Sequence, residues 1–283
     1  GLIATALCLP FAALAQGDVA VPSTMRIVVP FGPGASNDAI ARAVAPLLAK
    51  RLGNTVIVEN KAGAAGTIGA DFVAKSPRDG SVLLLTSSTF VTAAATQAKL
   101  PYDPLTAFAP VAMVGNGPML VAVSAASPIK SAADLVAAAR ARPGKITYAS
   151  SGIGSIAHLS SEMISDAAKV QMLHVPYKGA APALMDMAGG QIDMMVSNYS
   201  SLAPQIKGGK LRAIAVTSAQ PSPAFADLPP MATAAPGFAA DIWVAILAPA
   251  GTPAALVQRL NRELVDIANT PEVRALLEPD GAL

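Results

Sequence analysis

Residues 26–52 read RIVVPFGPGASNDAIARAVAPLLAKRL and contain one complete strand–loop–helix unit. The first five residues form a short apolar strand, and a glycine-rich loop follows at residues 31–37. From residue 38 to residue 52, apolar side chains recur at the period of an α-helix. Because strands and helices then keep alternating along the chain, the sequence predicts an α/β fold with parallel sheets and helices on both faces.

Three local signals place later helices. Ser131-x-x-Asp134 is typical of a capping box and predicts that a helix begins at residue 132. Thr252-Pro253 and Thr270-Pro271 each put a cap residue before a proline at the first helical position. These pairs predict two helices near the C-terminal end of the sequence.

Length and composition favour a globular protein of more than one domain. A chain of 283 residues corresponds to about two domains at roughly 150 residues each. A content of 53% hydrophobic and 13% charged residues excludes a disordered chain. The uncharged strands near Val111 and Leu120 offer a place for the chain to cross between lobes. We therefore predict two α/β lobes.

Charge and metal-ligating residues exclude several functions. The net charge is +2 and no cluster of basic residues is present, which argues against binding of nucleic acid. One Cys and two His leave little with which to build a metal centre. The sequence therefore predicts neither a metal site nor a cofactor.

Residues 1–15, GLIATALCLPFAALA, carry no charge and end in the small-x-small pattern Ala13-Leu14-Ala15. This is typical of the apolar core and cleavage site of a secretory signal peptide, here without its basic beginning. A buried N-terminal helix is the alternative. With cleavage after Ala15, Cys8 would leave with the signal, and the protein would be exported.

The loop at residues 31–38 has the features of an anion site. Its glycines allow the backbone to approach a ligand closely, and it opens a helix whose first N–H groups are unpaired and carry partial positive charge. A carboxylate or phosphate suits such a position. A plain tight turn, with Asp38 in the first helical turn, is the alternative.

The loop at residues 150–155, SSGIGS, is a second glycine-rich turn between a strand and a helix. Its hydroxyls and amides would hold a carboxylate without a cationic side chain. His158 lies one helical turn beyond Ser155, so the two can share a face. We favour His158 as a ligand hydrogen-bonder or a structural cap, and His174 as a packed core residue. Lys178 would complement an anion or remain a solvated loop charge.

Two enzymatic functions would also use loops of this kind, but each lacks part of its motif. A Ser–His hydrolase lacks the Gly-x-Ser-x-Gly pattern and a clearly placed acid. A nicotinamide-dependent dehydrogenase lacks the third glycine of the dinucleotide fingerprint, because Asn37 stands in its place. An exported α/β enzyme of either kind is the alternative function.

The ordered series of motifs resembles the solute receptors of tripartite tricarboxylate transporters, the Bug or TctC-like family, from residue 26 to the end. The resemblance is carried by motifs spread over the chain, each weak alone and specific as a set. They are Val29-Pro30-Phe31 with Pro33-Gly34, Asp38 and Arg42, Val58-Glu59-Asn60, Gly63-Ala64-Ala65-Gly66, Asp79-Gly80, Ser150–Ser155 with His158, His174-Val175-Pro176-Tyr177-Lys178-Gly179, Gly190-Gln191-Ile192-Asp193, Trp243 and Pro249-Ala250-Gly251-Thr252-Pro253. Ala35 stands where the family usually has a second glycine.

The resemblance implies a two-lobed, type II periplasmic-binding-protein-like fold with mixed sheets, helices on both faces, an interlobe cleft and a closing hinge. Lobe 1 would be discontinuous, built from residues 22–120 and 236–283, and lobe 2 would comprise residues 121–235. The protein would be a periplasmic receptor and not an enzyme. As a monomer, it would capture a small organic acid (a di- or tricarboxylate, an amino acid or an aromatic acid) and deliver it to the membrane permease subunits.

The resemblance also implies which residues hold the ligand carboxylate. Lobe 1 would contribute Phe31, Gly34, Ser36, Asn37, Asp38, Ser87, Ser88 and Thr89. Lobe 2 would contribute Ser151, Gly152, Gly154, Ser155, His158, Lys178, Gly179 and Asn198. Two such anion sites would suit a dicarboxylate.

Overall fold

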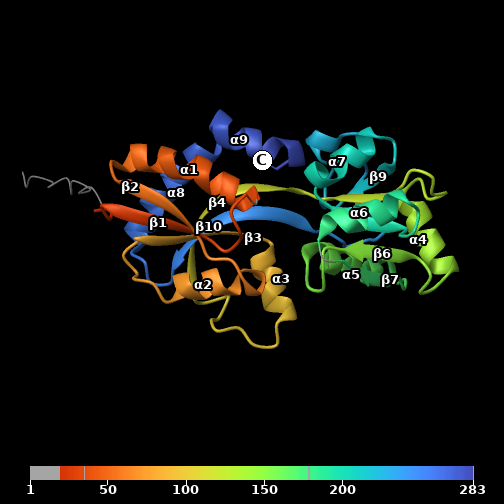
Figure 1. Cartoon of the computed structure of the whole chain (residues 1–283), viewed down its shortest axis with the longest axis horizontal. Helices are drawn as coiled ribbons and strands as arrows, with labels where there is room; N and C mark the ends of the chain where they lie inside the picture. Colours follow the sequence, from red (N-terminus) through yellow and green to blue (C-terminus); the bar gives the residue numbers. More distant parts are fainter. Residues whose placement is uncertain (1–19, 35, 178, 283) are drawn as a thin grey trace, which may run out of the picture.

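The computed structural model describes residues 20–34, 36–177 and 179–282. Two five-stranded sheets lie side by side along the long axis of the molecule (Figure 1). The expected signal peptide at residues 1–15, the Ala35 position and Lys178 lie outside the described residues. Among the helices of the described ranges, none is long and apolar enough to cross a membrane.

The first sheet has the strand order β2-β1-β3-β10-β4 and is buried on both faces. In β1, Ile27 and Val29 face the cluster made with α1, α8 and α9, whereas Val28 faces the cluster made with α2. Continuous apolar runs are expected when helices cover both sides of a sheet. The elements are β1 (Thr24–Val29), α1 (Ser36–Leu52), β2 (Thr55–Asn60), α2 (Thr67–Ala74), β3 (Val82–Ser87), α3 (Thr89–Thr96), β4 (Phe108–Pro118), β10 (Asp241–Pro249), α8 (Ala254–Ala268) and α9 (Pro271–Leu277).

The second sheet has the order β7-β6-β8-β5-β9 and repeats this arrangement. In β5, Val121 and Val123 pack on the α4 and α5 side, whereas Leu120 and Ala122 pack on the α6 and α7 side. The elements are β5 (Leu120–Ser124), α4 (Ala132–Ala141), β6 (Thr147–Ser150), α5 (Ile156–Ala168), β7 (Leu173–Pro176), α6 (Ala180–Ala188), β8 (Met194–Ser197), α7 (Tyr199–Lys207) and β9 (Leu211–Val216).

The parallel sheets predicted from strand–helix alternation are present only in part. β1, β2 and β3 are parallel, and so are β6, β7 and β8. β10 runs antiparallel to β3 and β4, and β5 runs antiparallel to β8 and β9. Every antiparallel pairing of the described strands involves β5 or β10, and each of these is the first strand after the chain crosses from one sheet to the other. A parallel neighbour requires a helix to carry the chain back along the sheet, and in the described part of the chain no such helix directly precedes these two strands. The sheets are therefore mixed, as the family resemblance implies.

The chain crosses from the first sheet to the second at Met119, between β4 and β5, and returns in the segment before β10. Thr217, which is fully buried, joins the two crossings. Its hydroxyl accepts the Met119 N–H at 2.8 Å, and the Ala240 N–H donates to the Thr217 carbonyl at 3.0 Å. The crossing segments are thus held to each other by hydrogen bonds that involve Thr217.

The helix-start signals have mixed outcomes. Ser131 caps α4, because its hydroxyl accepts the Asp134 N–H at 3.1 Å. The late helices α8 and α9 are present. Thr270 is the N-cap of α9 and Pro271 its first residue, as expected, whereas the N-cap of α8 is Pro253 and not Thr252. Neither threonine side chain makes a capping hydrogen bond. Each of their hydroxyls donates instead to a carbonyl three residues earlier, at 2.8 Å. Threonine often makes such local backbone contacts in turns.

Candidate functional site

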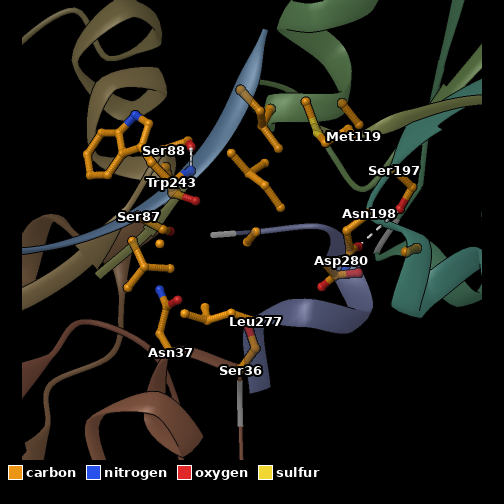
Figure 2. Close-up of a pocket in the computed structure, with 18 of the residues that line it drawn as sticks. Ser36, Asn37, Ser87, Ser88, Met119, Ser197, Asn198, Trp243, Leu277 and Asp280 are labelled. Atoms are coloured by element: carbon orange, nitrogen blue, oxygen red, sulfur yellow. Dashed lines mark hydrogen bonds between the residues drawn. The ribbon is translucent and has the colours of Figure 1, made fainter. Parts of the chain in front are cut away.

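A cavity of about 320 Å³ lies between the two sheets. This volume falls within the range of small-molecule sites, roughly 300–1,000 Å³. Figure 2 shows Asn37, Ser87 and Ser88 on one side and Ser197, Asn198 and Asp280 opposite them. The lining residues come from both sheets and from the C-terminal segment: Ser36, Asn37, Ile40, Ser87, Ser88, Thr89, Gly115, Met119, Ser151, Ile156, Ala157, Ala180, Met195, Val196, Ser197, Asn198, Ile242, Trp243, Val244, Leu276, Leu277, Asp280 and Ala282.

The polar wall on the side of the first sheet is made by two helix N-termini. Ser36 and Asn37 begin α1, and Ser88 and Thr89 begin α3. Ser88 is fixed to β10, because its hydroxyl accepts the Trp243 N–H at 2.9 Å and its own N–H donates to the Trp243 carbonyl at 3.2 Å. Free N–H groups at helix starts attract anions, so this wall suits a carboxylate.

Asp38 holds the loop that leads to this wall, and it does not itself line the cavity. Its carboxylate accepts the Gly34 N–H at 2.9 Å, Arg42 Nε at 3.0 Å and Asn60 Nδ2 at 2.8 Å. Asn60 Nδ2 also donates to the Phe31 carbonyl at 3.1 Å. The Arg42 guanidinium, followed by the Gly34 and Asn60 hydrogen bonds, lowers the pKa of Asp38 to about 2. The loop is therefore tied to a carboxylate that stays ionised.

Three of the expected ligand residues use their polar groups within this network and do not line the cavity. Phe31, Gly34 and Asp38 are not among the cavity-lining residues. The Gly34 N–H already has an acceptor in Asp38. In this conformation these residues position the loop, whereas Ser36 and Asn37 face the cavity. A direct contact of Phe31, Gly34 or Asp38 with ligand stays a prediction.

The second glycine-rich loop presents Ser151 to the cavity and is held from behind by His158. Gly154 donates its N–H to His158 Nδ1 at 3.2 Å, and Ser155 caps α5 by accepting the His158 N–H at 3.3 Å. The Ser155 hydroxyl meets the backbone of His158 and not its ring, which is not the geometry of a nucleophile and its base.

Behind the loop, His158 belongs to a stack of rings. Its ring centroid lies 4.0 Å from that of His174, which stacks in turn on Tyr148 at 4.9 Å. The Tyr148 hydroxyl donates to Glu162, and Ser150 Oγ lies 2.7 Å from His174 Nε2. Burial, followed by the nearby charge of His158, lowers the pKa of His174, although Glu162 opposes the shift. The stack supports the loop with one buried ring, Tyr148, and two half-buried ones, so His174 is not the core residue expected from the sequence.

The two lobes contact each other where this loop meets α3. Gly154 has φ +78°, and an added Cβ would lie 2.8 Å from Oγ1 of Thr96 across the interface. Oγ1 of Thr96 donates to the Thr92 carbonyl at 2.7 Å, which fixes the threonine side chain. Only a residue without a side chain fits at this close approach.

The remaining expected residues belong to the second lobe, and among the described ones only Asn198 lines the cavity. Gly179 is the N-cap of α6 at φ +116°, and its neighbour Ala180 lines the cavity. Gly152, Gly154, Ser155 and His158 do not line it. Asn198 does, but its side-chain amide donates to Asp280 Oδ2 at 3.1 Å.

Sequence reasoning missed the apolar lining and the C-terminal contribution. Met119 and β10 could have been suspected, because segments that cross between lobes must pass the cleft. Nothing in the local pattern of residues 276–282 indicates a place in a cavity.

Comparisons with known proteins agree with this architecture. The sequence profile described as "Tripartite tricarboxylate transporter family receptor" matches residues 40–282. Protein BugT of Bordetella pertussis is 36% identical over 274 residues, which is 96% of this chain and 84% of BugT. A solved R. palustris protein with adipate has a TM-score of 0.75 and 34% identity, covering 92% of this chain and 87% of its own. MatC from Rhodopseudomonas palustris, with bound malate, has a TM-score of 0.73 and 32% identity, and the match covers 92% of this chain and 89% of MatC.

Proposed function

The chain belongs to the family of receptors for tripartite tricarboxylate transporters, and we propose that it binds a small organic carboxylate in the cavity between its lobes. The cavity carries the proposal: one wall is built from the N-termini of α1 and α3, with Ser36, Asn37, Ser87, Ser88 and Thr89 as additional polar groups. These groups can stabilise a carboxylate by donating hydrogen bonds to it, without a cationic side chain. Similar proteins were solved with adipate and malate, which supports a carboxylate as the ligand here.

Closure of the two lobes is the proposed mechanism of capture. Lobe 1 would comprise residues 22–120 and 236–283, and lobe 2 residues 121–235, with the hinge at Met119 and Thr217. A ligand that contacts both lobes binds the closed state better and shifts the equilibrium towards it. Delivery to the permease subunits of a tripartite tricarboxylate transporter follows from the family and completes the proposed role.

The protein is proposed to act as a monomer in the periplasm, after export by the signal peptide at residues 1–15, and to catalyse no reaction. The contacts of Ser155 and His158 support the last point, because both residues build the loop. In an esterase assay, neither wild type nor Ser155→Ala/His158→Ala should show turnover above background. Turnover that the double variant abolishes would favour the hydrolase alternative.

Ligand binding is tested by isothermal titration and thermal shift with a panel of carboxylates, sugars and nicotinamide cofactors. Binding to the folded state raises the unfolding midpoint by mass action. We expect shifts with carboxylates only, and weakening of the best ligand in Ser36→Ala/Thr89→Ala. A response confined to nicotinamide cofactors would refute the proposal.

A further inference from the structure

A carboxylate from the C-terminal segment reaches from the first lobe to the second. η4 (Glu278–Asp280) follows α9, which packs against α1 in the first lobe. Asp280 accepts the Ser200 N–H at 2.6 Å, the Ser200 hydroxyl at 3.0 Å and Asn198 Nδ2 at 3.1 Å. Asn198 and Ser200 form the start of α7 in the second lobe. Figure 1 shows the C-terminal end lying between α9 and α7.

In this contact, the hydrogen-bond donors at the N-terminus of α7 are paired with the Asp280 carboxylate of the same chain. A helix start is a favourable place for a negative charge, and three donors point to the Asp280 carboxylate. The neighbouring Gly281 also meets the second lobe, since an added Cβ would lie 2.8 Å from Cε2 of Phe225. The C-terminal segment therefore bridges the lobes through both charge and packing.

The same carboxylate sets the charge of the cavity. Asp280 lines it, and every other described lining residue is uncharged. Figure 2 shows Asp280 opposite Asn37 and Ser87, across the cavity from the wall formed by α1 and α3. One end thus offers helix N-termini to an anion, and the other end already contains one.

We propose that Asp280 is a built-in carboxylate that links the lobes and excludes ligands with a second carboxylate at the α7 end. The ligand part of this inference rests on the proposed function. The preferred ligand has one carboxylate, bound at the α1 and α3 starts, and a neutral or cationic group at its far end. An ω-amino acid fits best, because its ammonium group would face Asp280. A dicarboxylate would place its second negative charge beside the Asp280 carboxylate, and like charges repel each other.

The test titrates three matched series of three to eight carbons: monocarboxylates, ω-amino acids and α,ω-dicarboxylates. In the wild type, the best ω-amino acid or monocarboxylate should bind at least about tenfold more tightly than the dicarboxylate of equal length. Asp280→Asn should reduce or invert this ratio. Glu278→Gln, which changes an exposed carboxylate two residues earlier, should leave it unchanged. A dicarboxylate preference in the wild type, or the same ratio in Asp280→Asn, would overturn the selectivity.

The bridge between the lobes is tested without ligand by small-angle X-ray scattering. Asp280→Asn and Asp280→Ala should increase the radius of gyration relative to the wild type and Glu278→Gln. Unchanged scattering in both Asp280 variants would overturn the bridge. If no carboxylate bound the wild type, the proposed function would fail, while the scattering comparison would still decide whether Asp280 links the lobes.

Discussion

Replacing Gly154 with alanine should weaken ligand binding by obstructing closure. The new Cβ would lie 2.8 Å from Oγ1 and 3.2 Å from Cβ of Thr96 on the opposite lobe. Oγ1 of Thr96 is held by the Thr92 carbonyl, so the side chain cannot simply rotate away. Overpacking of this kind costs about 1–3 kcal/mol. Because the open state escapes the contact, the cost falls on closure and should raise the Kd by about 5- to 150-fold.

A second effect of the same substitution must be separated from the first. Gly154 has φ +78°, and alanine in this conformation costs roughly 1 kcal/mol in the open and closed states alike. That cost lowers the unfolding midpoint without changing affinity. Affinity should be measured by isothermal titration with the best carboxylate, and stability by thermal unfolding.

The double variant Gly154→Ala/Thr96→Ala provides the control. It removes Oγ1 and Cγ2 of Thr96, so most of the lost affinity should return while the unfolding midpoint stays low. Wild-type affinity in Gly154→Ala would refute the reasoning. Equal weakness in the single and double variants would show that Thr96 is not the obstacle.

Three further predictions concern the parts that support the site. Asp38→Asn should lower the unfolding midpoint at neutral pH, because an amide cannot accept all three hydrogen bonds. The pKa of the Asp38 carboxyl is lowered from 3.8 to about 2 in the folded state. The difference in unfolding midpoint between wild type and Asp38→Asn should therefore shrink as the pH falls from 3.8 to about 2. His174 has a folded pKa below its ordinary 6.5, so stability should fall as the pH drops below that value, and His174→Gln should flatten the decline in pH-dependent melting. Thr217→Val leaves the Met119 N–H unpaired, at a cost of about 1–3 kcal/mol in urea unfolding, whereas Thr217→Ser should retain most of the stability.

Local sequence pattern predicted the elements that depend on local interactions. The unit at residues 26–52 has a strand period and then a helix period, and it forms β1 and α1 as expected. Both glycine-rich loops lie at the carboxyl end of a parallel strand, where α/β sheets place their ligand sites. Ser36, Asn37 and Ser151 line the cavity for this reason, although ligand contact remains a prediction.

Pairings between distant residues were not predictable from the pattern. Asp38 accepts a hydrogen bond from Asn60, 22 residues away. The ring of His158 in α5 stacks on that of His174 in β7. Asp280 meets Ser200 across 80 positions of sequence. From the sequence alone, Asp38 and His158 were candidate ligand residues, and Asp280 had no predicted role. Only the tertiary arrangement shows which hydrogen-bonding groups are already used.

The position of β10 has a consequence for the order of folding. The strands of the second sheet come from one continuous stretch, between Leu120 and Val216, so that lobe can collapse as soon as this stretch is available. In the first sheet, β10 lies between β3 and β4, and its pairing of Val244 with Ser87 spans more than half the chain. Contacts this distant in sequence form slowly. The inserted lobe should therefore protect its amide hydrogens first in refolding, and the sheet that carries the anion-binding wall should be completed last.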